Sequence, residues 1–118
     1  MQLFTKEILK ELAANGRRSQ EAQANCEYFD PYPVVKLFNP VGPAVWLLSE
    51  TDPDEPDYAF GLCDLGMQCP ELGSVLISEI VNHRGRLGLG IERDICFKPK
   101  HPLSWYTEQA RKHQRIIA

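Results

Sequence analysis

The sequence predicts an α+β domain: one mostly antiparallel sheet of about five strands, with two or three helices packed against one face. Short segments rich in β-branched and aromatic residues are separated by Gly, Pro and Asn turns through the middle of the chain. Other segments carry helix caps or helical periodicity. Because 118 residues is the usual size of one domain, we expect a single core.

The first helix is predicted to begin at Thr5, whose hydroxyl can cap the N–H groups of the first turn. It is predicted to stop at Asn15-Gly16, a pair that readily adopts a left-handed conformation. Residues 17–33 show little apolar periodicity, which predicts a surface loop.

The boundaries of the remaining elements are predicted from capping residues, turn residues and apolar periodicity. Ser78 is the predicted cap of a short helix over residues 79–84, and a terminal helix is predicted over residues 103–115. Strands are predicted over residues 34–38, 44–48, 58–65, 73–77 and 91–97.

The composition is that of an ordinary globular protein, with 43% hydrophobic and 25% charged residues. No apolar run reaches the roughly 18 residues that span a bilayer, and the first residues lack the pattern of a signal peptide. We therefore expect a cytoplasmic protein with no membrane partner, whose four cysteines are free thiols.

No metal, cofactor or catalytic residue is predicted. Cys63 and Cys69 are spaced more widely than the ligands of a zinc knuckle, and His83 and His101 are not paired at helical spacing. A cysteine–histidine pair could still form a nucleophile and base, but no nucleophile-elbow pattern is present.

Four carboxylates and one arginine are candidate binding residues. The carboxylates are Asp64, Glu71, Glu92 and Asp94. They could converge at one sheet edge and serve acid–base catalysis in a small hydrolase, but we favour solvent exposure or bonding to turn N–H groups. Arg93 falls on the apolar face of the last strand, where it needs a partner or faces a ligand. Asp64 and Glu71 are its candidate partners.

An acidic loop is predicted between the second and third strands. Its carboxylates are Glu50, Asp52, Asp54, Glu55 and Asp57. Two prolines in the same segment oppose strand pairing. The loop could occupy a basic pocket on a partner, but a net charge of −3 does not supply the dense acidic surface of a DNA mimic.

Charge is distributed unevenly along the chain. Residues 1–81 contain 5 Lys/Arg and 13 Asp/Glu, whereas residues 82–118 contain 8 and 3. We favour mutual neutralisation of the two parts; alternatively the basic end binds nucleic acid, with Trp105 and Tyr106 stacking on bases. The cations of that alternative are Lys98, Lys100, Arg111, Lys112 and Arg115.

Several motifs resemble those of a bacterial domain-of-unknown-function family, number 2958. They are residues 36–40 with the following Trp46 strand, 60–66, 70–73 and 90–94. The resemblance covers about residues 3–98, so we expect an α+β core over residues 1–98 and a basic helical extension over residues 99–118. The resemblance implies a protein carried by plasmids, integrative elements or phages, which is a genetic context and not a chemistry.

The leading hypothesis is a non-enzymatic binding protein of a mobile element that contacts a host or element protein. Its specific version is an inhibitor of host defence, either anti-CRISPR or antirestriction, a link that rests on context. Exposed aromatic residues would anchor the contact; the candidates are Trp46, Tyr58, Trp105 and Tyr106. The alternatives are a nucleic-acid-associated accessory factor and a small hydrolase. The sequence predicts neither the partner nor the oligomeric state.

Arg93→Ala is expected to lower the melting temperature by several degrees, because a guanidinium on an apolar face must be held by partners. Thermal unfolding followed by circular dichroism checks this. An unchanged melting temperature would instead place Arg93 at a surface or binding position.

Overall fold

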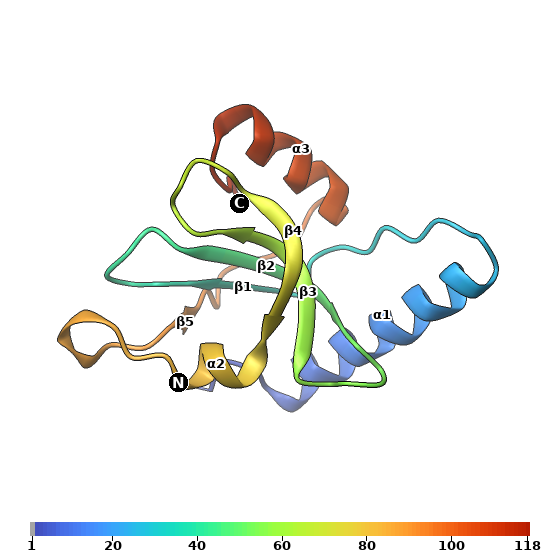
Figure 1. Cartoon of the computed structure of the whole chain (residues 1–118), viewed down its shortest axis with the longest axis horizontal. Coiled ribbons are helices and arrows are strands. Elements are labelled where there is room, and N and C mark those ends of the chain that lie inside the picture. Colours follow the sequence, from blue (N-terminus) through green and yellow to red (C-terminus); the bar gives the residue numbers. More distant parts are fainter. Residues whose placement is uncertain (1) are drawn as a thin grey trace.

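An antiparallel sheet in the order β4-β3-β2-β1-β5 forms the centre of the protein, with helices on both of its faces (Figure 1). The structure is a computed structural model that describes residues 2–118. The α+β class predicted from the sequence is confirmed.

The elements follow one another along the chain with short connections. The strands are β1 (Val35–Phe38), β2 (Val45–Thr51), β3 (Tyr58–Asp64), β4 (Glu71–Leu76) and β5 (Glu92–Arg93). The helices are α1 (Lys6–Ala24), α2 (Ile77–Asn82), the 3-10 turn η1 (Arg86–Gly88) and α3 (Leu103–His113).

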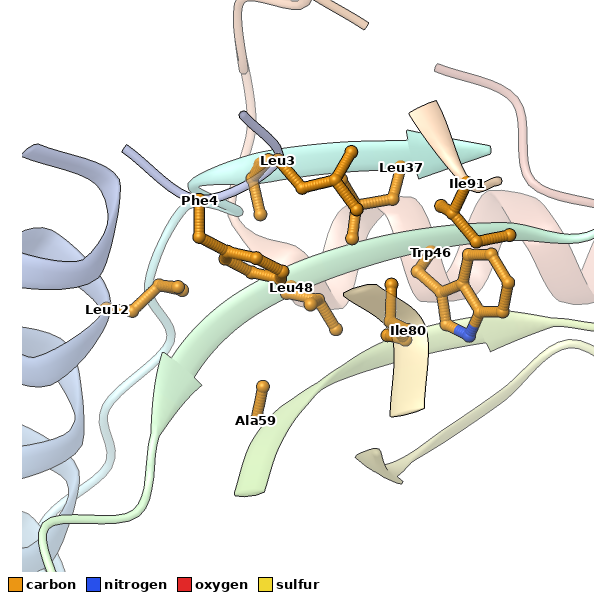
Figure 2. Packing of buried hydrophobic residues seen from close by; sticks show 10 residues of the cluster. Leu3, Phe4, Leu12, Leu37, Trp46, Leu48, Ala59, Ile80 and Ile91 are labelled. Carbon is orange, nitrogen blue, oxygen red and sulfur yellow. The ribbon is translucent and has the colours of Figure 1, made fainter. Parts of the chain in front are cut away.

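The larger hydrophobic core lies between the sheet and the helices α1 and α2. Phe4, Leu12 and Leu48 of β2 belong to one buried cluster, in which Trp46 of the same strand lies beside Ile80 and Ile91 (Figure 2). The core therefore joins residues from both edges of the sheet. Ile80 lies in α2, which follows the edge strand β4, and Ile91 immediately precedes the other edge strand, β5.

A second core lies on the opposite face, under α3. Leu103, Tyr106 and Ala110 of this helix pack against Leu47 and Leu62 of the sheet. Because neighbouring strand residues point to opposite faces, burial of both Leu47 and Leu48 requires cover on both sides. The expectation that all helices share one face was therefore wrong.

Both ends of α3 are held by carboxylates from distant parts of the chain. Asp30 accepts a hydrogen bond from the Ser104 N–H at 3.1 Å, where the first turn leaves N–H groups unpaired. Beyond the other end, Asp64 accepts from the Ile116 N–H at 3.0 Å. Whether residues 1–98 form a core without this helix stays a prediction.

The first helix is longer than predicted. It begins after the Thr5 cap as expected, with the Ile8 N–H bonded to the Thr5 hydroxyl, but it runs through Asn15-Gly16 to Ala24. The residues after Gly16 include Arg, Gln, Glu and Ala, which are good helix formers and extend the helix. The predicted loop over residues 17–33 therefore begins only after Ala24.

Gly16 is required by close packing, not by a turn. A Cβ atom at this position would lie 1.8 Å from the backbone oxygen of Thr51 in β2. The helix can approach the strand this closely only because the side chain is absent. The glycine that was interpreted as a helix stop is therefore a contact point between α1 and the sheet.

Two later elements also differ from prediction. The last strand was expected over residues 91–97 but pairs only at Glu92–Arg93, because Asp94 accepts from the Cys96 N–H at 2.9 Å and turns the chain. Ser78 does not cap α2; its hydroxyl donates to Asp57 at 2.6 Å, and the helix begins at Ile77.

Gly16→Ala is expected to lower the free energy of unfolding by about 1–3 kcal/mol, because overpacking against Thr51 outweighs the better helix propensity of alanine. Urea unfolding measures this difference. Gly73→Ala is the control, since no atom lies within 4 Å of a Cβ placed there, and its effect should stay within about 0.5 kcal/mol. A stabilised Gly16→Ala protein would contradict the close contact.

Candidate functional site

An apolar groove of about 530 Å³ lies between α2 and the sheet. Its walls come from β2, β4, α2 and the segment before β5, so it forms where the sheet brings distant strands together. Its lining includes the apolar and aromatic residues Trp46, Tyr58, Leu65, Val75, Ile80 and Ile91. Small-molecule and peptide sites in proteins are typically concave and mostly apolar in this way.

Trp46 borders this groove, whose lining also includes the polar side chains of Glu79 and His83. Its side chain is 9% exposed and lies beside Ile80 and Ile91 (Figure 2). Within residues 2–118 the indole Nε1–H donates no hydrogen bond, although this part of the chain has no buried polar side-chain atom without a partner. The N–H therefore retains contact with solvent where the indole borders the groove. A buried indole usually finds an acceptor, so this donor is available to a ligand.

The groove is bordered by an open sheet edge. β4 is the outermost strand on this side of the sheet, and its residues Ser74, Val75 and Leu76 line the groove. An edge strand presents unpaired backbone donors and acceptors that can pair with an added strand. Tyr58 and Leu65 are exposed at the rim, and Leu65 keeps 55% of its surface accessible.

A polar cleft of about 610 Å³ lies between α1 and the connection from β2 to β3. It is lined by Glu50, Asp52, Asp54 and Glu55. Glu50 and Thr51 belong to β2, so the prediction of a loop from Glu50 to Asp57 was wrong at these two residues. A register shift between Leu48 and Glu50 in the pairing with β3 accompanies this extension of the strand.

The predicted loop carboxylates serve mainly local structure. Asp52 accepts from the Asp54 N–H at 2.9 Å, and Asp54 accepts from the Gln20 amide at 3.0 Å. Asp57 accepts from the backbone and hydroxyl of Ser78. These bonds hold the connection to α1 and α2 and leave Glu55 as an exposed carboxylate.

The four candidate catalytic carboxylates do not converge. Asp64 and Glu71 lie on β3 and β4, whereas Glu92 and Asp94 lie at β5, the opposite edge of the sheet. Asp64 is buried and accepts from the Gly66 N–H at 2.9 Å, as predicted for a turn-bonding residue. Asp94 forms an ion pair with Lys36 at 3.5 Å.

Arg93 holds the N-terminal segment against the sheet edge. Its guanidinium donates to the carbonyl oxygens of Gln2 at 2.8 Å and Leu3 at 3.2 Å. β3 lies three strand positions from β5, about 14 Å across the sheet, and β4 lies farther still. The expected pairing with Asp64 or Glu71 is therefore wrong, and carbonyl groups take that place.

The other predicted site residues fall into separate places. Trp105 is exposed, whereas Tyr106 is buried in the second core, so only the first is an accessible anchor. Lys98 and Lys100 precede α3, and the remaining predicted cations lie near its C-terminal end; these are Arg111, Lys112 and Arg115.

The residues considered for metal binding and thiol catalysis also lie apart. Cys69 lines a pocket beside Arg111, His83 lines the Trp46 groove, and His101 stacks on Trp105. Burial raises the pKa of the Cys63 thiol to about 11. Within residues 2–118 no three His, Cys, Asp or Glu side chains are grouped as a metal site would require.

The chain belongs to the family described as "Protein of unknown function (DUF2958)", whose model matches residues 3–117. The match extends beyond the motifs recognised in the sequence and includes α3. No curated protein and no solved structure matches the chain. Among residues 2–118, no helix is long and apolar enough to cross a membrane.

The groove was missed because its residues are far apart in the sequence. Trp46, Ile80 and Ile91 were separately typical of core positions. No local spacing indicates that one face of the indole would border a groove, since that depends on how α2 and the segment before β5 meet over β2.

Burial raises the pKa of Glu50, and the nearby Ser19 hydroxyl acts in the opposite direction. The raised pKa means that the folded chain disfavours the ionised carboxylate. The contribution of this group to the free energy of unfolding is therefore greatest at low pH and falls as the pH rises through the raised folded pKa.

Glu50→Gln is accordingly expected to raise the melting temperature at pH 7.5, with a smaller gain at pH 4, where the carboxyl is largely protonated. Thermal unfolding at both pH values measures the difference. Glu55→Gln, which changes an exposed carboxylate of the adjoining connection, is the control. An equal gain at both pH values would assign the effect to packing instead of charge.

Proposed function

We propose that this protein is a non-enzymatic binding protein of a plasmid, phage or integrative element that acts through contact with a host or element protein. Inhibition of host defence, as an anti-CRISPR or antirestriction factor, is the specific version. The observation that supports a binding role is the apolar groove with a Trp46 Nε1–H at its side that has no acceptor among residues 2–118. The genetic context and the defence target rest on the family resemblance alone.

The groove favours a partner segment of particular chemistry. Its apolar walls, including Val75, Ile80 and Ile91, would bury an apolar side chain of the partner. The Trp46 Nε1–H would donate to a neighbouring backbone carbonyl, which replaces the solvent contact with a protein acceptor. We therefore propose that the partner presents an exposed apolar residue on an extended segment.

The free edge of β4 suits the same kind of segment. An extended chain can pair with the backbone of an edge strand while its alternate side chains enter adjacent pockets. Ser74, Val75 and Leu76 belong both to this edge and to the groove wall. One segment could thus use backbone pairing for affinity and the groove for specificity.

Leu65→Arg is expected to weaken partner binding at least about tenfold, because it places a charge at the rim of a surface that must be desolvated on binding. The tagged protein is used to capture proteins from host cells, and the affinity is then measured with the purified partner. Leu87→Arg is the matched control, since Leu87 is 87% exposed and lies outside the groove. Equal binding by both variants would exclude the groove.

The host-defence version has a separate test. Expression of the protein should raise the transformation efficiency of a plasmid that carries a CRISPR target or a restriction site, and Leu65→Arg should remove this effect while Leu87→Arg retains it. A protein that binds its partner through the groove but leaves transformation unchanged in such strains would argue against defence inhibition. It would leave the binding function in place.

A further inference from the structure

A second surface, separate from the Trp46 groove, lies where the segment after β5 enters α3. It contains a pocket of about 490 Å³. Its aromatic and basic lining residues are Phe97, Lys98, Lys100, His101, Trp105 and Tyr106. Aromatic and basic side chains therefore meet at one place on the α3 side of the sheet.

The aromatic part is an ordered stack. The rings of His101 and Trp105 are 3.8 Å apart at an interplanar angle of 20°, and Tyr106 meets Trp105 at 86°. The Tyr106 hydroxyl accepts from the Lys100 N–H at 3.0 Å, which links the stack to the segment before the helix. Trp105 nevertheless keeps 38% of its surface exposed, so part of the stack is open to solvent.

The basic side chains of this pocket are two exposed lysines. Lys98 and Lys100 are exposed, and neither forms an ion pair within the part of the chain that the structure describes. Asp94 and Ala118 also line this pocket, and Lys36 contacts both: its ammonium pairs with the Asp94 carboxylate at 3.5 Å and donates to the Ala118 backbone oxygen at 2.7 Å. The two lysines therefore give the pocket a positive potential that favours an anionic ligand.

The other predicted cations do not reach this pocket. Lys112 pairs with Glu108 at 3.7 Å. Arg111 lines a pocket beside Cys69 and Glu71, and Arg115 lines another beside Asp64. The basic end of the sequence is thus divided, and only Lys98 and Lys100 are combined with an exposed aromatic stack.

We propose that this surface binds single-stranded nucleic acid, with a base stacked on the His101–Trp105 pair and phosphates held by Lys98 and Lys100. Stacking needs the open face of an unpaired base, which a duplex does not offer. The combination of a flat ring and adjacent negative charge matches a nucleotide in a strand, and the short lysine pair suits recognition without sequence preference.

Binding is measured by fluorescence anisotropy with a labelled 12-nucleotide oligothymidylate and the full chain. Two neutralised phosphates on a single strand predict a salt slope of about −1.4, so the Kd should rise about sevenfold between 50 and 200 mM salt. A duplex of the same length should bind more weakly than the single strand. Equal binding of the duplex would overturn the stacking of a base.

Two pairs of variants test base stacking on Trp105 and phosphate binding by the two lysines. Trp105→Ala should weaken binding about fivefold or more, and Trp105→Phe, which keeps a ring, should weaken it less. Lys98→Gln with Lys100→Gln should remove most of the salt dependence. Arg111→Gln with Arg115→Gln removes the same formal charge from positions that line other pockets and should leave the Kd nearly unchanged.

Besides equal binding of the duplex, three results would overturn the proposal: no binding at 50 mM salt, equal losses in the two double variants, or equally strong binding of an acidic peptide. The last would assign the surface to an acidic protein. Melting temperatures confirm that each variant is folded. None of these results bears on the Trp46 groove, because the variants leave its residues unchanged.

Discussion

Burial of β2 on both faces is the constraint on which the rest of the structure depends. Leu47 and Leu48 are adjacent and fully buried, so α3 must cover one face while α1 and α2 cover the other. Gly16 allows α1 to lie directly against the end of this strand. Asp30 and Asp64 hold the two ends of α3 in place over the opposite face. The central strand is thereby enclosed by segments from the two ends of the chain.

Enclosure of β2 also accounts for the two surfaces proposed to bind partners. Where α2 and the segment before β5 close over Trp46, they cover most of the indole but leave the groove beside it. Where the chain crosses to the other face to begin α3, it brings Lys98 and Lys100 beside Trp105. Each surface thus arises at the margin of one hydrophobic core. A protein of this size can in this way present two chemically different surfaces without a second domain.

Much of the fold could be predicted because its strands are short, locally patterned and separated by turn residues. The centres of β1, β2, β3 and β4 were all predicted, and the Thr5 cap was identified from its position before an amphipathic segment. The errors arose where a local signal had a tertiary meaning. Gly16 resembled a helix stop but is a packing contact, and the alternating pattern after β5 was interrupted by an Asp94 turn.

The sequence by itself determined the α+β class, the family and the supply of aromatic and charged side chains, because these follow from local pattern and composition. Tertiary structure alone decided which side chains share a surface. It separated Asp64 and Glu71 from Glu92 and Asp94 by three and four strand positions in the sheet. It also joined Trp46 to Ile80 and Ile91. Strand order and helix packing set such distances, and neither is encoded in the spacing of residues along the chain.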